Sequence, residues 1–78
     1  MNYTDQLERE VGEQGQFQRV VMHAFGLRPA WREVFLLCDV QGFTIAEAAI
    51  ILGLGPVVVA TRLDQARRQM DTRLQGRP

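Results

Sequence analysis

The residues best suited to recognition chemistry lie between Thr44 and Leu74, where arginines and hydroxyl groups surround a glycine-containing turn. The nine residues of the chain that are lysine or arginine are all arginine. The planar guanidinium of arginine binds phosphate oxygens, or the edge of guanine, through paired hydrogen bonds. This stretch therefore predicts a surface that recognises a nucleic acid.

The charge of the chain is divided unevenly, although its net charge is zero. Residues 1–52 hold four arginines against seven acids, a net charge of −3. Residues 53–78 hold five arginines against two acids, a net charge of +3. Such asymmetry between the halves of a chain is typical of a nucleic-acid-binding face, which would lie in the second half here.

No residue set typical of an enzyme or a metal site occurs in the sequence. The chain has one cysteine, Cys38, and one histidine, His23, and it lacks paired carboxylates or a phosphate-cradling loop. We expect Cys38 to be a buried core thiol, and we expect no catalysis, cofactor or metal. A lone cysteine and a polar N-terminus unlike a signal peptide favour the cytoplasm. No apolar run approaches the ~18 residues of a membrane span.

Helices must position the arginines, because apolar residues recur at helical spacing and no strand alternation appears. The first helix is expected from about Thr4 to Phe25. Gly12 and Gly15 weaken its middle, so residues 1–12 are expected to form a flexible segment or linker and residues 13–75 the folded domain. The apolar side chains at helical spacing in this helix are Leu7, Val11, Phe17, Val21 and Phe25.

Caps delimit the second and third helices. The second is expected from Pro29 to about Val40, since proline suits a first helical position and Gly42 fits the end. Thr44 is expected to cap the third helix, with Glu47 at the capping-box position. Gly53 is expected to end this helix in the left-handed conformation.

A fourth helix is expected from Pro56 to about Leu74, and it would carry four of the nine arginines. Its inner face is predicted to consist of Val59, Leu63, Ala66 and Met70. The fold class is therefore all-α, a small four-helix domain.

The third and fourth helices show the spacing of a helix-turn-helix. Ala49 must be small because the next helix crosses close to it, Gly53 permits the sharp turn, and Val59 packs back onto the third helix. In such a unit the second helix lies in the major groove of DNA, with its N-terminal residues at the base edges. The pattern leaves open an αα-corner with no role in DNA binding.

The helix-turn-helix predicts a set of nine DNA-contacting residues. Arginines of the fourth helix are expected to hold phosphates, and the N-terminus of the third helix to approach another. Since Val59 faces the core, Val57 and Val58 cannot both be buried; exposed, they suit either thymine methyl groups or a protein partner. The set consists of Thr44, Val57, Val58, Thr61, Arg62, Gln65, Arg67, Arg68 and Arg73.

The stretch before the helix-turn-helix, from Leu27 to Thr44, contains an Arg-Glu-Val-Phe-Leu-Leu block, an acidic residue and a glycine in order. This string resembles region 4 of extracytoplasmic-function sigma factors of the sigma-70 family, and the resemblance covers about Phe17 to Leu74. It implies a transcription initiation factor domain that reads the −35 element of promoter DNA and docks on the β flap of RNA polymerase. Many family members are also held by an anti-sigma factor.

The expected recognition helix departs from the family pattern. Ala60 stands where a lysine is common, Val58 where a threonine is common, and Asp64 where a histidine or basic residue is common. A second hypothesis follows: a region 4-like interaction module that binds an anti-sigma factor, the polymerase flap or a second copy of itself, with weak DNA affinity. The output domain of a response regulator fits the block before the turn less well. Sigma factors of this family also need a region 2, which binds the core polymerase and melts the −10 element. Because region 2 does not fit in 78 residues, the chain is expected to be either a piece of a longer factor or a stand-alone region 4-like protein.

Overall fold

The structure, a computed structural model, describes residues 15 and 17–75. Residues 17–24 are helical, and they are followed by α2 (Pro29–Phe35), the π-helical turn η1 (Leu36–Val40), α3 (Ile45–Leu52) and α4 (Pro56–Leu74). No strand occurs in this part of the chain, which confirms the predicted all-α class. The expected flexible segment, residues 1–12, lies outside the described residues.

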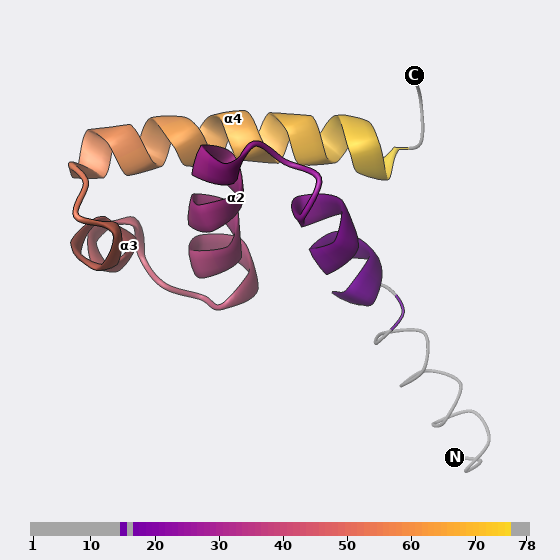
Figure 1. The fold of residues 1–78 in the computed structure, drawn as a ribbon, viewed down its shortest axis with the longest axis horizontal. Coiled ribbons are helices and arrows are strands. Elements are labelled where there is room, and N and C mark those ends of the chain that lie inside the picture. The colour runs from indigo at the N-terminus through magenta and orange to yellow at the C-terminus, as the bar shows by residue number, and fades with distance from the viewer. Residues whose placement is uncertain (1–14, 16, 76–78) are drawn as a thin grey trace, which may run out of the picture.

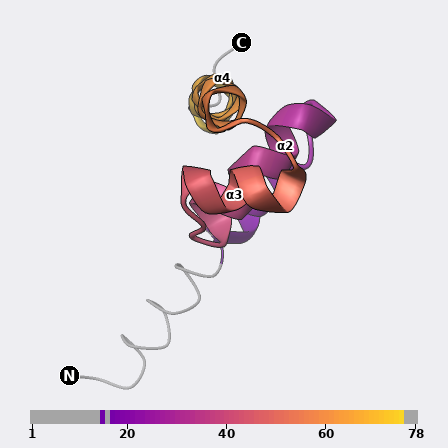
Figure 2. The same ribbon diagram turned by 90° about the vertical axis from the view of Figure 1, so that its left-hand side faces the viewer.

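The helix α4 is the element against which the others are arranged. It contacts α2 near its middle and α3 near its start (Figure 1). Figure 2, which looks along α4, shows α2 and α3 on one side of it, so that no element within the described residues covers its other side, called the uncovered side of α4 below. Residues 17–24 lie at the opposite end of α4 from α3 (Figure 1).

Two hydrophobic clusters form the core, and α4 contributes to both. The first cluster lies toward the C-terminal half of α4 and consists of Ala24, Leu27, Phe35, Ala66 and Met70. The second lies under the helix-turn-helix and consists of Val34, Ala48, Ala49, Val59 and Leu63. All four residues predicted for the inner face of α4 are therefore buried, and the bounds predicted for this helix are confirmed.

The buried face of the first helix is rotated by one residue position from the expected face. Phe17 and Phe25 are each 58 % exposed, whereas Ala24 is fully buried and Val20 packs against the first cluster. A shift of one residue turns the helix by about 100°. The small side chain of Ala24 lets this helix come close to the rest of the core, and the larger aromatic side chains are left at the surface.

The second helix is not α-helical along its whole expected length. Its α-helical part ends at Phe35, and Leu36–Val40 form a π turn in which the N–H of Gln41 donates to the carbonyl of Leu36 at 3.0 Å. The wider turn holds one more residue than an α turn does. Gly42, with φ of 85°, takes the left-handed conformation after it, as expected for a glycine at a helix end.

The two-cluster core predicts a sharp contrast between two aliphatic positions. Leu63 is 2 % exposed, so Leu63→Ala should lower the free energy of unfolding by about 2–5 kcal/mol. Ile50 is 82 % exposed, so Ile50→Ala should change it by less than about 0.5 kcal/mol. Urea unfolding followed by circular dichroism measures both. Equal losses for the two variants would contradict the assignment of the core.

Candidate nucleic-acid interface

The start of α3 is fixed by a reciprocal capping box. The Glu47 N–H donates to Oγ1 of Thr44 at 3.1 Å, and the Thr44 N–H donates to Oε1 of Glu47 at 2.9 Å. The Thr44 N–H, which donates to the Glu47 carboxylate, is the main cause that lowers the pKa of this carboxyl below its ordinary value. The predicted cap is confirmed, and it sets where α3 begins relative to the turn that follows.

The turn between α3 and α4 has helix-turn-helix geometry. Gly53 is left-handed, with φ of 67° and ψ of 35°, and the Leu54 N–H donates to the carbonyl of Ala49 at 3.0 Å. The chain bends by 108° from α3 into α4, which falls within the roughly 90–120° of such units. Ala49 and Val59 are both buried in the second cluster, as the small-residue rule requires. The three positions predicted to define the unit therefore perform their expected roles.

The uncovered side of α4 carries most of the predicted DNA-contacting residues. Val57 is 78 % exposed and Val58 is 40 % exposed, as the position of the buried Val59 requires. The Thr61 hydroxyl donates to the carbonyl of Val57 at 2.9 Å, so its single donor is already used. The exposed polar residues that follow at helical spacing are Thr61, Gln65 and Arg68.

Two arginines of α4 can turn toward a ligand at low cost. Arg62 is half-buried and forms no hydrogen bond or ion pair with any other described residue. Arg68 pairs with Asp64 at 3.1 Å, but the side chains are 79 % and 61 % exposed. Such a surface pair contributes at most about 1 kcal/mol, so the Arg68 guanidinium can exchange its carboxylate for a phosphate.

Two other predicted phosphate ligands are bound by partners in the domain, although the Arg67 side chain is 56 % exposed. Arg67 donates to Asp39 of η1 through Nε at 2.8 Å and through its terminal nitrogen at 2.6 Å. This hydrogen bonding raises the pKa of Arg67 above its ordinary value. Arg73 donates to the carbonyl of Gly26 at 3.0 Å, and its Nε is buried without a partner among the described residues. Both side chains therefore join α4 to earlier segments of the chain, Arg67 to η1 and Arg73 to the turn before α2.

Sequence position alone could not reveal the partners of Arg67 and Arg73. Asp39 and Arg67 are 28 positions apart and meet only because the π turn and α4 pack together. Ile50 and Ile51 are 82 % and 53 % exposed. Their exposure was detectable, since three successive apolar residues in one helix cannot all face one core.

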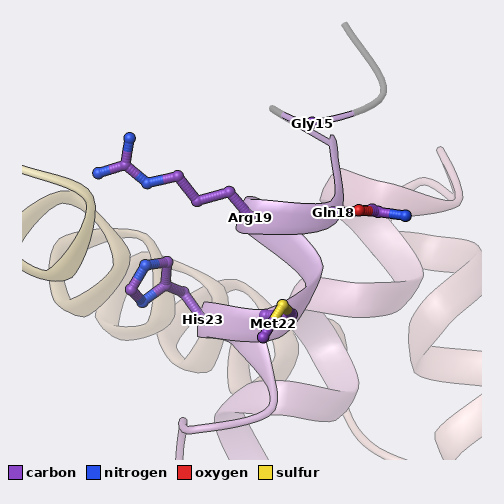
Figure 3. A pocket seen from close by; sticks show the side chains of 5 residues that line it. All are labelled: Gly15, Gln18, Arg19, Met22 and His23. Carbon is purple, nitrogen blue, oxygen red and sulfur yellow. The ribbon is translucent and has the colours of Figure 1, made fainter. Parts of the chain in front are cut away.

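Open concavities also occur among the described residues. One lies along the first helix and is lined by Gly15, Gln18, Arg19, Met22 and His23 (Figure 3).

Cys38 is half-buried rather than fully buried, and its burial raises the pKa of the thiol. Among residues 15 and 17–75, no group of three His, Cys, Asp or Glu residues is placed to hold a metal ion. In the same residues no single helix is long and apolar enough to cross a membrane. The helices α3 and α4 have that length and composition only together, as a pair bent by 108°.

The geometry of α3, the left-handed turn and α4 is that of a helix-turn-helix, the unit found in many DNA-binding domains. The family model described as Sigma-70, region 4 matches residues 26–70, which is more than half of the chain. The chain therefore belongs to the sigma-70 region 4 family, whose domains bind promoter DNA in transcription initiation and are not known as enzymes. Comparisons with curated proteins and with solved structures gave no match. The match lies inside the predicted domain, whose outer bounds at 13 and 75 stay a prediction.

The capping box predicts a pH-dependent contribution of Glu47 to stability. Because its pKa is lowered in the folded domain, this contribution is present above the ordinary glutamate pKa and is lost as the pH falls through the folded value. The melting temperature of the wild type should exceed that of Glu47→Gln at neutral pH, and the difference should vanish in acid.

Thermal unfolding at several pH values, followed by circular dichroism, measures this difference. Thr44→Ala is the matched control, because it removes the threonine acceptor and should cost about 1 kcal/mol even in acid. A melting-temperature difference between wild type and Glu47→Gln that stays constant with pH would contradict the assigned role of the carboxylate.

Proposed function

We propose that this chain is the −35-reading domain of an extracytoplasmic-function sigma factor and that it acts in the cytoplasm, where its DNA target lies. The family membership supports a promoter-binding role. The particular type rests on the resemblance of Leu27–Thr44 to that group. The single observation that carries the proposal is the uncovered side of α4, whose exposed residues face away from both clusters of the core.

In the proposed complex α4 enters the major groove with its N-terminal end foremost. Val57, Val58 and Thr61 would then meet base edges, since they occupy its first two exposed turns. Arg62 and Arg68 would hold phosphates on either side of the groove. The phosphate-binding group also includes Gln65 and the N-terminus of α3 at Thr44.

Arg67 and Arg73 are left out of the proposed contact set. Each would have to abandon a partner inside the domain before it reached a phosphate. Asp64 adds a negative charge beside Arg68. Two phosphate-binding arginines give a modest electrostatic attraction, so we propose that tight promoter binding requires the polymerase to hold the domain in place.

The polymerase contact is proposed for the end of the domain that lies away from the helix-turn-helix. Phe17, Met22 and Phe25 are exposed there, at 58 %, 74 % and 58 %. The helix of residues 17–24 and the N-terminal end of α4 lie at opposite ends of the described part of the chain (Figure 1), so DNA and the β flap of the polymerase could be bound together. An anti-sigma factor would compete for the same apolar surface.

A second candidate function is favoured by the extent of exposed apolar surface. Ile50, Ile51 and Val57 are all more than half exposed, around the turn that should meet DNA. If these residues bind protein, the chain is an interaction module for an anti-sigma factor, the polymerase flap or a second copy of itself. The two functions differ in whether binding depends on salt through released counterions.

Duplex binding should weaken with salt to a degree set by the available phosphate ligands. With two to three contacts, the slope of log K against log salt should be about −2 to −3, or roughly 10- to 40-fold between about 50 and 200 mM salt. Fluorescence anisotropy with a random-sequence duplex measures this slope, because counterion release does not depend on sequence. A flat response, or no binding at low salt, would favour the interaction module.

Two arginine variants separate a phosphate ligand from a structural one. Arg62→Ala should lower the salt slope by about 0.9 and weaken binding evenly across sequences. Arg67→Ala removes the same charge from α4 but should leave the slope near its wild-type value, while costing about 1 kcal/mol of stability through the lost Asp39 pair. Anisotropy and thermal melts measure the two effects. An equal loss of slope in both variants would contradict the division.

A further inference from the structure

The first turn of α4 has no side chain that can form a hydrogen bond. Leu54, Gly55, Pro56, Val57 and Val58 follow one another, and the first polar side chain is that of Thr61. The Thr61 hydroxyl donates to the Val57 carbonyl at 2.9 Å, so it can act toward a ligand only as an acceptor. The first free side-chain donor along α4 is therefore Arg62. The leading end of this helix is an apolar surface made of Val57 and Val58.

The chemistry of base edges limits what such a surface can read. In the major groove every base pair presents hydrogen-bond donors and acceptors, and thymine alone of the four bases adds an apolar group, its C5 methyl. A valine set against a donor or acceptor would strip it of water without replacing the hydrogen bond, which weakens binding. A valine set against the methyl removes apolar area from water on both sides.

We propose that Val57 and Val58 make the chain select thymine at the bases that meet the start of α4. The inference rests on the proposed function, since it requires α4 to lie in the major groove. The valines belong to the same uncovered side of α4 as the polar residues Thr61, Gln65 and Arg68. This continuity assigns the apolar surface to the ligand of that side, which is duplex DNA, rather than to a separate protein partner.

The test begins with duplexes selected by the chain from a randomised pool. The enriched sequences should share one or two thymines at fixed positions. Replacing each such thymine with deoxyuridine removes only the methyl group, and it should weaken wild-type binding by about threefold to fourfold per methyl in contact. Replacing thymine with deoxyuridine at the other positions of the duplex should leave the affinity unchanged.

Paired variants connect the methyl effect to the two valines. The double variant Val57→Ser, Val58→Ser should bind the thymine and uridine duplexes equally, while keeping the wild-type salt slope and helical circular dichroism. The matched control Ile50→Ser, Ile51→Ser makes the same change of polarity at exposed positions of α3 and should keep the methyl effect.

Three outcomes would overturn the inference. One is a selected site without fixed thymines, and another is wild-type affinity that does not change with uridine. In both cases the chain still binds duplex DNA, so the proposed function would stand while thymine selection fails. The third is the absence of duplex binding even at low salt, in which case both the proposed function and this inference are wrong.

Discussion

The arrangement of this domain depends on the buried stripe of one helix. Val59 and Leu63 of α4 pack into the cluster under the helix-turn-helix, while Ala66 and Met70 pack into the cluster shared with the first helix. Side chains leave a helix at fixed angles. Burial of this stripe in two clusters therefore fixes the rotation of α4 about its own axis. The residues opposite the stripe are then presented together, and the close contact of Ala49 with Val59 sets the angle at which they leave the turn.

The helix-turn-helix and the buried stripe of α4 could be predicted from the sequence, because the local signals and the packing agree in these segments. The cap at Thr44, the left-handed Gly53, the bounds of α4 and its buried stripe each have a local cause that one segment contains. The buried face of the first helix could not be predicted, because two neighbouring stripes were equally apolar. Only the approach of the other helices decided that the stripe with the small Ala24 would be buried.

The candidate site was predictable as a location but not in its electrostatics. Sequence position alone assigned phosphate contacts to four arginines of α4, and the fold gives two of them partners from distant segments. Charge counting therefore overstates the positive surface of the helix. Arg67 and Arg73 also help this short domain with a small core to hold its helices together. Arg67 joins α4 to η1, and Arg73 joins it to the turn before α2.

In the proposed complex the uncovered side of α4, and not the apolar end formed by residues 17–25, meets DNA. Titration of the ¹⁵N-labelled chain with duplex DNA, followed residue by residue in amide NMR spectra, tests it most directly. We expect the amides of residues 57–68 and of Thr44 to shift or broaden as DNA is added, while those of residues 17–25 stay in place. Changes confined to residues 17–25, or spread evenly over the domain, would contradict it.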